Sequence, residues 1–181
     1  MHTAYPRHIF FPRSRSPPEW VQSIQLAFAK VREDIDSTKP THKTSNEVLR
    51  ILRPHLEAIG FEVESGKRVG EKLHRPVFFG EMGEPSVKYE IDAYHQEFGI
   101  VLEVEAGRSI KGNAIYRDII QMSLMVDAKY AVIAMPIQYR FLTRHRHIVN
   151  RSYEEGRKLL DAIWSSERLE LPFEGLLLVG Y

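Results

Sequence analysis

Two alternating runs of apolar and polar residues, joined by a short turn, constrain the fold of this chain more than any other feature. Residues 87–94 alternate, and residues 100–106 alternate again after the turn sequence HQEFG. A period of two is typical of a strand with one buried face, and two such runs around a short turn predict a β-hairpin. A largely apolar helix over 113–126 and a nearly continuous apolar strand over 129–137 follow. We therefore expect the hairpin to lie inside a sheet that helices cover.

The rest of the chain supplies further helices and strands around this hairpin. Proline and glycine clusters separate the periodic segments, which indicates loops between them. The alternation of helices and strands predicts an α/β fold, with a central mixed β-sheet flanked by helices on both sides. The further elements that we expect are helices over 17–36, over 44–60 and from 152 onward, strands over 61–64 and 176–179, loops with at most a short strand over 65–86, and a basic connection over 138–147.

Composition excludes several classes of protein. The chain has 181 residues, which suits one domain, and it contains no cysteine, so disulfides, thiolate zinc sites and a cysteine nucleophile are excluded. No apolar run approaches the length of a membrane span, so we expect no membrane partner and a cytoplasmic location. The net charge is +1, so any binding of a polyanion must rely on local positive charge. Residues 1–16 are rich in proline and arginine and predict an N-terminal arm.

Acidic residues gather on the polar faces of the predicted hairpin. Glu90 and Asp92 share one strand face, and Glu103 and Glu105 share a face of the partner strand. The turn places Asp92 and Glu103 within about 5–8 Å at their Cβ atoms. Like charges at that distance need a cation, a proton or a divalent metal to compensate them. Such a pattern is also typical of the solvated face of an antiparallel sheet, and that interpretation competes with a metal site.

The segment IDAYHQEFGIVLEVEAG resembles the PD-(D/E)xK, or restriction-endonuclease-like, phosphodiesterases, whose core has the order α-β-β-β-α-β. Asp92 is followed by ten residues and then by Glu103, Val104 and Glu105. The helix and strand that come next are similar to the family's next elements, so the resemblance covers roughly residues 44–137. Ile91 stands where the motif name has proline. Glu105 stands where lysine is usual, a Glu-x-Glu variant that BamHI also carries.

The resemblance implies a restriction-endonuclease-like domain over residues 17–181, with an extra N-terminal helix before the core. It implies that Asp92, Glu103 and the Val104 carbonyl bind Mg²⁺ or Mn²⁺, and that Glu105 binds or orients the attacking water. The implied function is that of a metal-dependent endonuclease, which hydrolyses DNA phosphodiester bonds with a metal-activated water.

Several other residues are candidates for the same site. Glu47 lies on the helix where many family members contribute a further acid, although Thr44 and Glu47 also match a capping box. Lys111 or Arg117 could supply the positive charge that the missing lysine would carry. Basic residues near aromatic ones suit phosphate contacts and base stacking. The candidates for nucleic-acid binding are Arg108, Lys111, Arg117, Arg140, Arg144 and Arg146.

Two other functions compete with the nuclease. A catalytically weak or inactive domain of the same fold would bind nucleic acid or a protein partner, and Glu105 in the lysine position favours it. An unrelated enzyme with paired carboxylates, such as a glycosidase, would act without metal and need a cleft rich in tryptophan. The chain has only Trp20 and Trp164. The partner that we expect is nucleic acid, DNA in the first place, and we also expect that the chain can form a homodimer.

Overall fold

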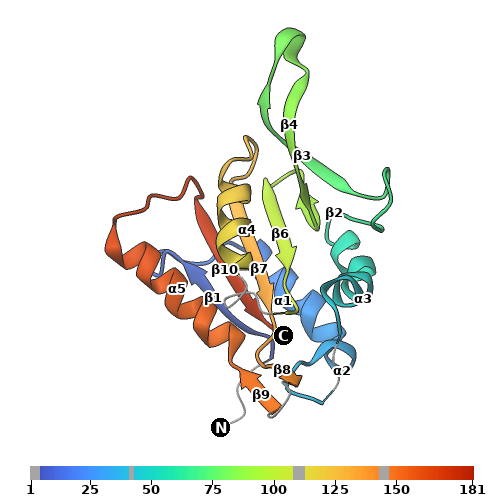
Figure 1. Ribbon diagram of the computed structural model, residues 1–181. Coiled ribbons are helices and arrows are strands. Elements are labelled where there is room, and N and C mark those ends of the chain that lie inside the picture. The colour runs from blue at the N-terminus through green and yellow to red at the C-terminus, as the bar shows by residue number, and fades with distance from the viewer. Residues whose placement is uncertain (1–4, 41–42, 108–112, 143–146) are drawn as a thin grey trace.

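A six-stranded mixed sheet forms the centre of the protein. The computed structural model describes residues 5–40, 43–107, 113–142 and 147–181. The strand order is β1-β10-β7-β6-β5-β2, with β10, β7 and β6 parallel and the outer pairs antiparallel (Figure 1). The sheet strands are β1 Arg7–Phe11, β2 Phe61–Val63, β5 Ala93–His95, β6 Ile100–Val104, β7 Tyr130–Met135 and β10 Gly175–Gly180.

In the described residues, five α-helices and two additional hairpins complete the fold. The order α3, β2, β5, β6, α4, β7 matches the predicted core, and α1 and α2 precede it as the predicted extra N-terminal helix. The helices are α1 Trp20–Lys30, α2 Arg32–Ile35, α3 Ser45–Glu57, α4 Ala114–Ser123 and α5 Ser152–Ser166. The hairpins are β3 Leu73–Phe79 with β4 Pro85–Ile91, joined by the 3₁₀ turn η1 Glu81–Gly83, and β8 Tyr139–Leu142 with β9 His147–Asn150.

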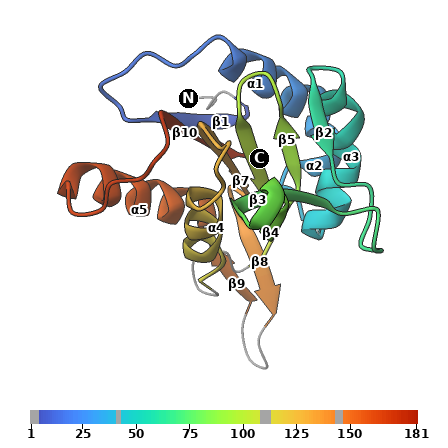
Figure 2. The same ribbon diagram turned by 90° about the horizontal axis from the view of Figure 1, so that it is seen from above.

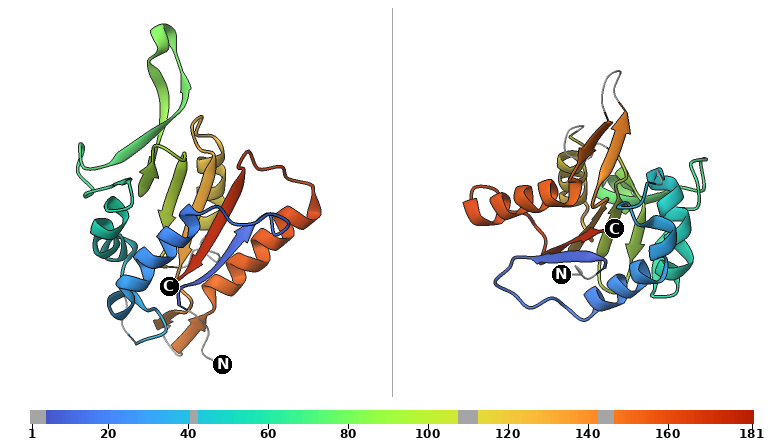
Figure 3. Two further views of the ribbon diagram at one scale, coloured as in Figure 1. Left: turned by 180° about the vertical axis from the view of Figure 1, so that it is seen from behind. Right: turned by 90° about the horizontal axis from the view of Figure 1, so that it is seen from below.

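Helices cover both faces of the sheet, as predicted. The helices α1, α2 and α3 lie on one side, and α4 and α5 lie on the other (Figures 2 and 3). Side chains of the central strands alternate between two cores, so that Val132 and Leu177 face the α1–α3 side while Ile133 and Leu178 face the α4–α5 side. All four are fully buried. This double burial explains the nearly continuous apolar sequence of β7 and β10.

Three segments differ from the predictions. Residues 7–11, expected within an N-terminal arm, form strand β1 at the edge of the sheet, because Phe10 packs into one core and Phe11 into the other. Residues 65–86, expected to be loops, contain β3 and the start of β4, and the basic connection over 138–147 contains the β8–β9 hairpin. No helix in the described part of the chain has both the length and the apolar character needed to cross a membrane.

The β3–β4 hairpin projects far from the sheet (Figures 1 and 3). Its base is clamped to the segment between α4 and β7. The Val126 amide donates a hydrogen bond to the Pro76 carbonyl, and the Arg75 guanidinium forms an ion pair with Asp127 while it lies 3.8 Å from the centre of the Tyr94 ring. The outer half of the hairpin is exposed, including Phe78, Phe79 and Met82.

Candidate active site

Asp92 and Glu103 are neighbours in the sheet, where β5 begins and β6 ends. Asp92 lies between β4 and β5, and the pairing of Ala93 with Leu102 places it beside Glu103 on β6, in agreement with the predicted hairpin register. An Asp92 carboxylate oxygen accepts a hydrogen bond of 2.7 Å from the Val104 amide. The backbone therefore fixes the orientation of the Asp92 side chain.

Glu105 lies just beyond the end of β6 and faces the first turns of α4. Its Oε1 atom is 4.0 Å from Nη2 of Arg117, and the same nitrogen is 2.8 Å from Oδ1 of Asp118. Asp118 is only 3% exposed, and its second carboxylate oxygen has no hydrogen-bond partner among the described residues. On the other side of the strand, the Tyr181 hydroxyl donates a 2.6 Å hydrogen bond to the Glu105 carbonyl. Glu105 is thus held from both sides of the sheet.

The carboxyl groups strongly perturb each other's ionisation. Burial raises the pKa of Asp92 to about 6, against the lowering effect of the Val104 amide. Burial, followed by the charges of Asp92 and Asp118, raises the pKa of Glu103 well above its usual value. Burial and a hydrogen bond with Asp118 raise the pKa of Glu105 to about 8. Perturbed acids of this kind gather at functional sites, and the cause here is a cluster of carboxyl groups with little access to water.

These residues line an open cleft of about 550 Å³. The helix α3, the strands β4 and β6, the helix α4 and the loop after β2 form its walls. Six acidic and four basic side chains line it, so negative charge predominates. The acids are Glu64, Glu90, Asp92, Glu103, Glu105 and Asp118, and the cations are Lys67, Lys72, Lys88 and Arg117.

The donor set fits a hard divalent cation. Carboxylate and carbonyl oxygens are the ligands that Mg²⁺ and Mn²⁺ prefer. The buried second oxygen of Asp118 and the raised pKa values of Glu103 and Glu105 show that carboxyl groups crowd together here, a repulsion that a divalent cation would relieve. Within the described ranges, no group of three histidine, aspartate or glutamate side chains already surrounds one point as metal ligands do. Asp92, Glu103 and the Val104 carbonyl are the residues that would hold the ion.

The structure brings some predicted residues into the cleft and leaves others outside it. Arg117 lines the cleft. Glu47 does not, because its carboxylate accepts hydrogen bonds from the amide and hydroxyl of Thr44 and closes the capping box of α3. Its neighbours Ser45 and Asn46 line the cleft instead. Four further candidates lie outside the described residues, namely Arg108, Lys111, Arg144 and Arg146.

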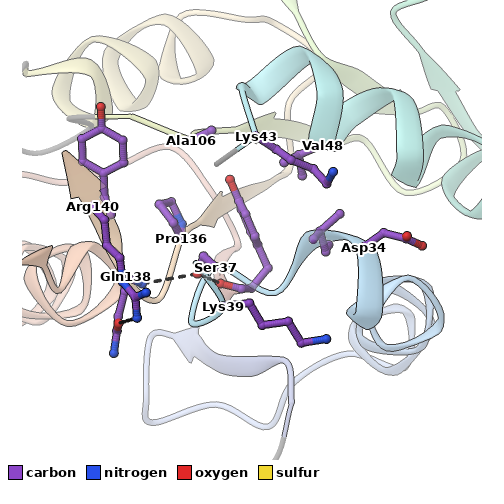
Figure 4. A pocket seen from close by; sticks show the side chains of 12 residues that line it. Asp34, Ser37, Lys39, Lys43, Val48, Ala106, Pro136, Gln138 and Arg140 are labelled. Carbon is purple, nitrogen blue, oxygen red and sulfur yellow. Dashed lines mark hydrogen bonds between the residues drawn. The ribbon is translucent and has the colours of Figure 1, made fainter. Parts of the chain in front are cut away.

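Arg140 lies in a separate small pocket, shown in Figure 4. The pocket has a volume of about 20 Å³, room for about one water molecule, and Lys39 and Lys43 also line it. The Arg140 guanidinium donates hydrogen bonds to the Thr38 carbonyl and the Gln138 side chain, at 2.8 and 3.0 Å. Arg140 therefore anchors the segment after β7 to the loop after α2, and it does not line the carboxylate cleft.

Sequence reasoning missed several residues of the cleft. Asp118 escaped because a single acid on a helix carries no signal beyond its place after Arg117. Glu64 ends the strand predicted over 61–64, and its amide donates a 2.8 Å hydrogen bond to the Asp92 carbonyl, which ties the two acidic residues together. Lys72 lies just before β3 in a segment predicted to be a loop, whereas Lys88 lies on β4, within the predicted strand over 87–94. Lys72 forms a 2.5 Å ion pair with Glu90.

Comparison with solved structures defines the class of fold. A crystal structure of the restriction endonuclease BglII complexed with a DNA 16-mer is 14% identical to this chain, and the match covers 98% of this chain and 78% of that one with a TM-score of 0.54. The crystal structure of free BglII is 13% identical, with coverage of 98% and 79% and a TM-score of 0.45. No protein-family model and no curated protein matches the sequence. The chain has a restriction-endonuclease-like fold, as its sequence motif predicted.

Proposed function

We propose that this protein is a metal-dependent endonuclease that hydrolyses phosphodiester bonds of DNA. The observation that carries the proposal is the cluster of Asp92, Glu103 and Glu105. These residues lie together at the end of strand β6 in a restriction-endonuclease-like sheet, and their pKa values are strongly perturbed. The cleft around them is open enough to admit a nucleic-acid strand. Its lysines and Arg117 offer contacts for phosphate oxygens.

Each residue of the cluster has a distinct role in this proposal. Asp92 and Glu103 would hold Mg²⁺ or Mn²⁺ together with the Val104 carbonyl, and the hydrogen bond from the Val104 amide keeps Asp92 in place. The chemistry supplied by the ion is a lowered pKa of a bound water and stabilisation of charge on the phosphate. Glu105 would orient the attacking water and accept its proton, since its raised pKa makes it a better base than an ordinary glutamate.

Arg117 is proposed to replace the positive charge that a lysine would carry at position 105. Only the position of a cationic tip matters for stabilising a developing negative charge, so a cation on the neighbouring helix serves the same purpose. Arg117 lies 4.0 Å from Glu105, and its side chain is 64% exposed, so it can approach a phosphate in the cleft.

Cleavage assays on supercoiled plasmid and on single-stranded DNA, in Mg²⁺ and in Mn²⁺, test this proposal. We expect the wild type to cut, and Asp92→Ala and Glu103→Gln to lose cutting by at least two orders of magnitude. Glu97→Gln is the matched control, because Glu97 lies in the exposed turn of the same β5–β6 hairpin, outside the cleft. Cutting that persists in a chelator would overturn the proposal, and so would full activity of Asp92→Ala.

The alternative of a binding domain without catalysis makes a different prediction for the same samples. A folded wild type that binds Mn²⁺ and DNA but cuts neither substrate would favour that alternative. Loss of Mn²⁺ binding in Asp92→Ala, measured by electron paramagnetic resonance, would then still assign the carboxylates to a metal. Glu105→Lys would be the informative variant, because gained cutting would identify Glu105 as the reason for inactivity.

We further propose that the homodimer expected from the sequence forms through α4. Tyr116, Ile120 and Leu124 are spaced by four residues and are 44, 51 and 46% exposed, so they form an apolar stripe on the solvent side of the helix. A stripe without charge is complementary to itself across a twofold axis. The same helix carries Arg117 and Gln121 in the cleft, so this pairing would bring two clefts close together.

The oligomeric state in solution tests the dimer independently of cleavage. We expect light scattering to give the mass of a dimer for the wild type and of a monomer for Ile120→Glu. Leu26→Glu is the control, because Leu26 is similarly exposed, at 55%, on α1 across the sheet. The chain has no cysteine, so Ile120→Cys can be cross-linked without background. A monomeric wild type that is not cross-linked at position 120 would overturn this interface.

A further inference from the structure

The carboxylate cleft continues into a second hollow beside α3. This hollow has a volume of about 230 Å³ and lies between α3 and the loop after β2. Asn46, Glu64 and Lys67 line both spaces. The two spaces therefore adjoin at these residues, and together they extend from the carboxylates along the helix as what we call the α3 groove. The residues that line only the second part include Arg50 and Arg53.

Cations line the groove on one face of α3. Asn46, Arg50 and Arg53 are separated by four and three residues, which places their side chains on the same side of the helix. The seven-residue separation between Asn46 and Arg53 corresponds to about 10 Å along the helix axis. One strand of B-form DNA rises about 3.4 Å per nucleotide, so this length corresponds to about three nucleotides. Lys67 lies on the opposite wall.

The balance of acidic and basic side chains changes along the groove. In the carboxylate cleft acids outnumber cations by six to four, whereas in the second part Arg50, Arg53 and Lys67 outnumber the acids by three to two. The two acids are Glu47 and Glu64, and Glu47 already accepts hydrogen bonds from Thr44. The Arg53 guanidinium forms an ion pair with the Glu57 carboxylate, with 2.7 Å between Nε and Oε1. Arg50 is exposed, so its guanidinium can reach a phosphate in the groove.

We propose that this α3 groove binds the sugar-phosphate backbone of one nucleic-acid strand over about three nucleotides, beginning at Asn46 where the groove meets the carboxylate cleft. Arg50 and Lys67 contact phosphates from the two walls, Arg53 adds a contact at the far end, and Asn46 lies where the groove meets the cleft. The identity of the ligand rests on the proposed nuclease function. The groove supplies the attraction that the acidic cleft lacks, and it sets the direction in which the strand leaves the site.

The salt dependence of binding provides a direct test. Fluorescence anisotropy would give the Kd for a short labelled duplex with EDTA present, between 50 and 200 mM NaCl. Each cation that contacts a phosphate of B-form DNA adds about 0.9 to the slope of log K against log salt concentration. The double variant Arg50→Gln/Lys67→Gln should therefore have a slope smaller by about 1.8. Lys30→Gln/Arg168→Gln removes two exposed cations away from the groove and should leave the slope unchanged.

Neutral methylphosphonate linkages locate the contact on the strand. As a single neutral linkage is moved along one strand, it should weaken wild-type binding several-fold within a run of about three nucleotides on one side of the cut, and the Arg50→Gln/Lys67→Gln variant should show no such run. If the wild type cuts DNA but Arg50→Gln/Lys67→Gln has the same salt slope as Lys30→Gln/Arg168→Gln, the proposed groove is overturned and the proposed nuclease function is not. A wild type that neither cuts nor binds DNA would overturn the proposed function and the groove together.

Discussion

Replacing Asp92 by asparagine should stabilise the folded protein above neutral pH. Asn has the shape of Asp without its charge, so the variant removes the cost of burying an ionised carboxylate. The pKa of Asp92 is raised from 3.8 to about 6, and a tenfold change in an ionisation equilibrium corresponds to about 1.4 kcal/mol. The ionised group therefore costs the folded state about 3 kcal/mol. This net cost already includes the stronger hydrogen bond that the ionised carboxylate accepts from the Val104 amide, so nothing further is subtracted for the neutral Asn.

The sign of the pH dependence follows from the direction of this shift. An acid whose pKa is higher in the folded than in the unfolded state binds more protons when folded, so stability falls as pH rises from about 4 to above 6. At pH 4.5 the cost of Asp92 is about 1 kcal/mol, so the variant should be more stable than the wild type by only about that amount. At pH 8 the variant should be more stable by about 3 kcal/mol.

Urea unfolding at pH 4.5 and pH 8, followed by the fluorescence of Trp20 and Trp164, measures both differences. Divalent metal gives a second readout, since Mg²⁺ at a hundredfold excess over its Kd should stabilise the wild type by about 2.7 kcal/mol and Asp92→Asn hardly at all. Glu97→Gln should respond to pH and Mg²⁺ as the wild type does. An Asp92→Asn variant that is less stable than the wild type at pH 8 would refute this reasoning. So would a difference in free energy of unfolding between variant and wild type that is the same at pH 4.5 and pH 8.

Three further substitutions have effects that the structure defines. Arg117→Gln removes a cation that lowers the pKa of Glu105, so the rising limb of the pH–rate profile of cleavage should move to higher pH. Thr44→Ala removes the cap of α3 and should cost about 0.5–2 kcal/mol in urea unfolding. Gly180→Ala places a Cβ atom 2.6 Å from the Tyr153 ring, so we expect a loss of about 1–3 kcal/mol in the same assay, and an unchanged midpoint would contradict that contact.

The sequence predicted the parts of the fold whose side chains follow a clear period. The strands β6 and β7 and the helices α3 and α4 appear where the patterns placed them, and so does the pairing that makes Asp92 a neighbour of Glu103. Burial in the two cores fixes which positions of these elements are apolar. The spacing of the apolar residues in the sequence therefore indicates directly whether a segment is a helix or a strand. The same burial is what perturbs the acids of the candidate site.

The segments that sequence analysis missed obtain their structure from distant partners. Strand β1 exists because it pairs with β10, more than 160 residues later in the chain, and no local pattern records that partner. The outer half of the β3–β4 hairpin is mostly exposed, so residues 77–86 lack the alternation that burial imposes, whereas β4 alternates from residue 87 onward. Glu47 fits two interpretations in the sequence, a capping box and a catalytic acid, and the contact with Thr44 decides for the capping box.

The clamp at the base of the β3–β4 hairpin isolates the carboxylates from the hairpin's outer half. Asp92 follows directly after β4, so bending of the hairpin would otherwise displace it. The Val126 and Pro76 hydrogen bond and the Arg75 and Asp127 ion pair hold the hairpin between its outer half and Asp92. The outer half can therefore change in length or sequence without altering the spacing of the acids. The position of the acids therefore does not depend on the outer half of the hairpin, which makes this half a suitable place to graft a new recognition element.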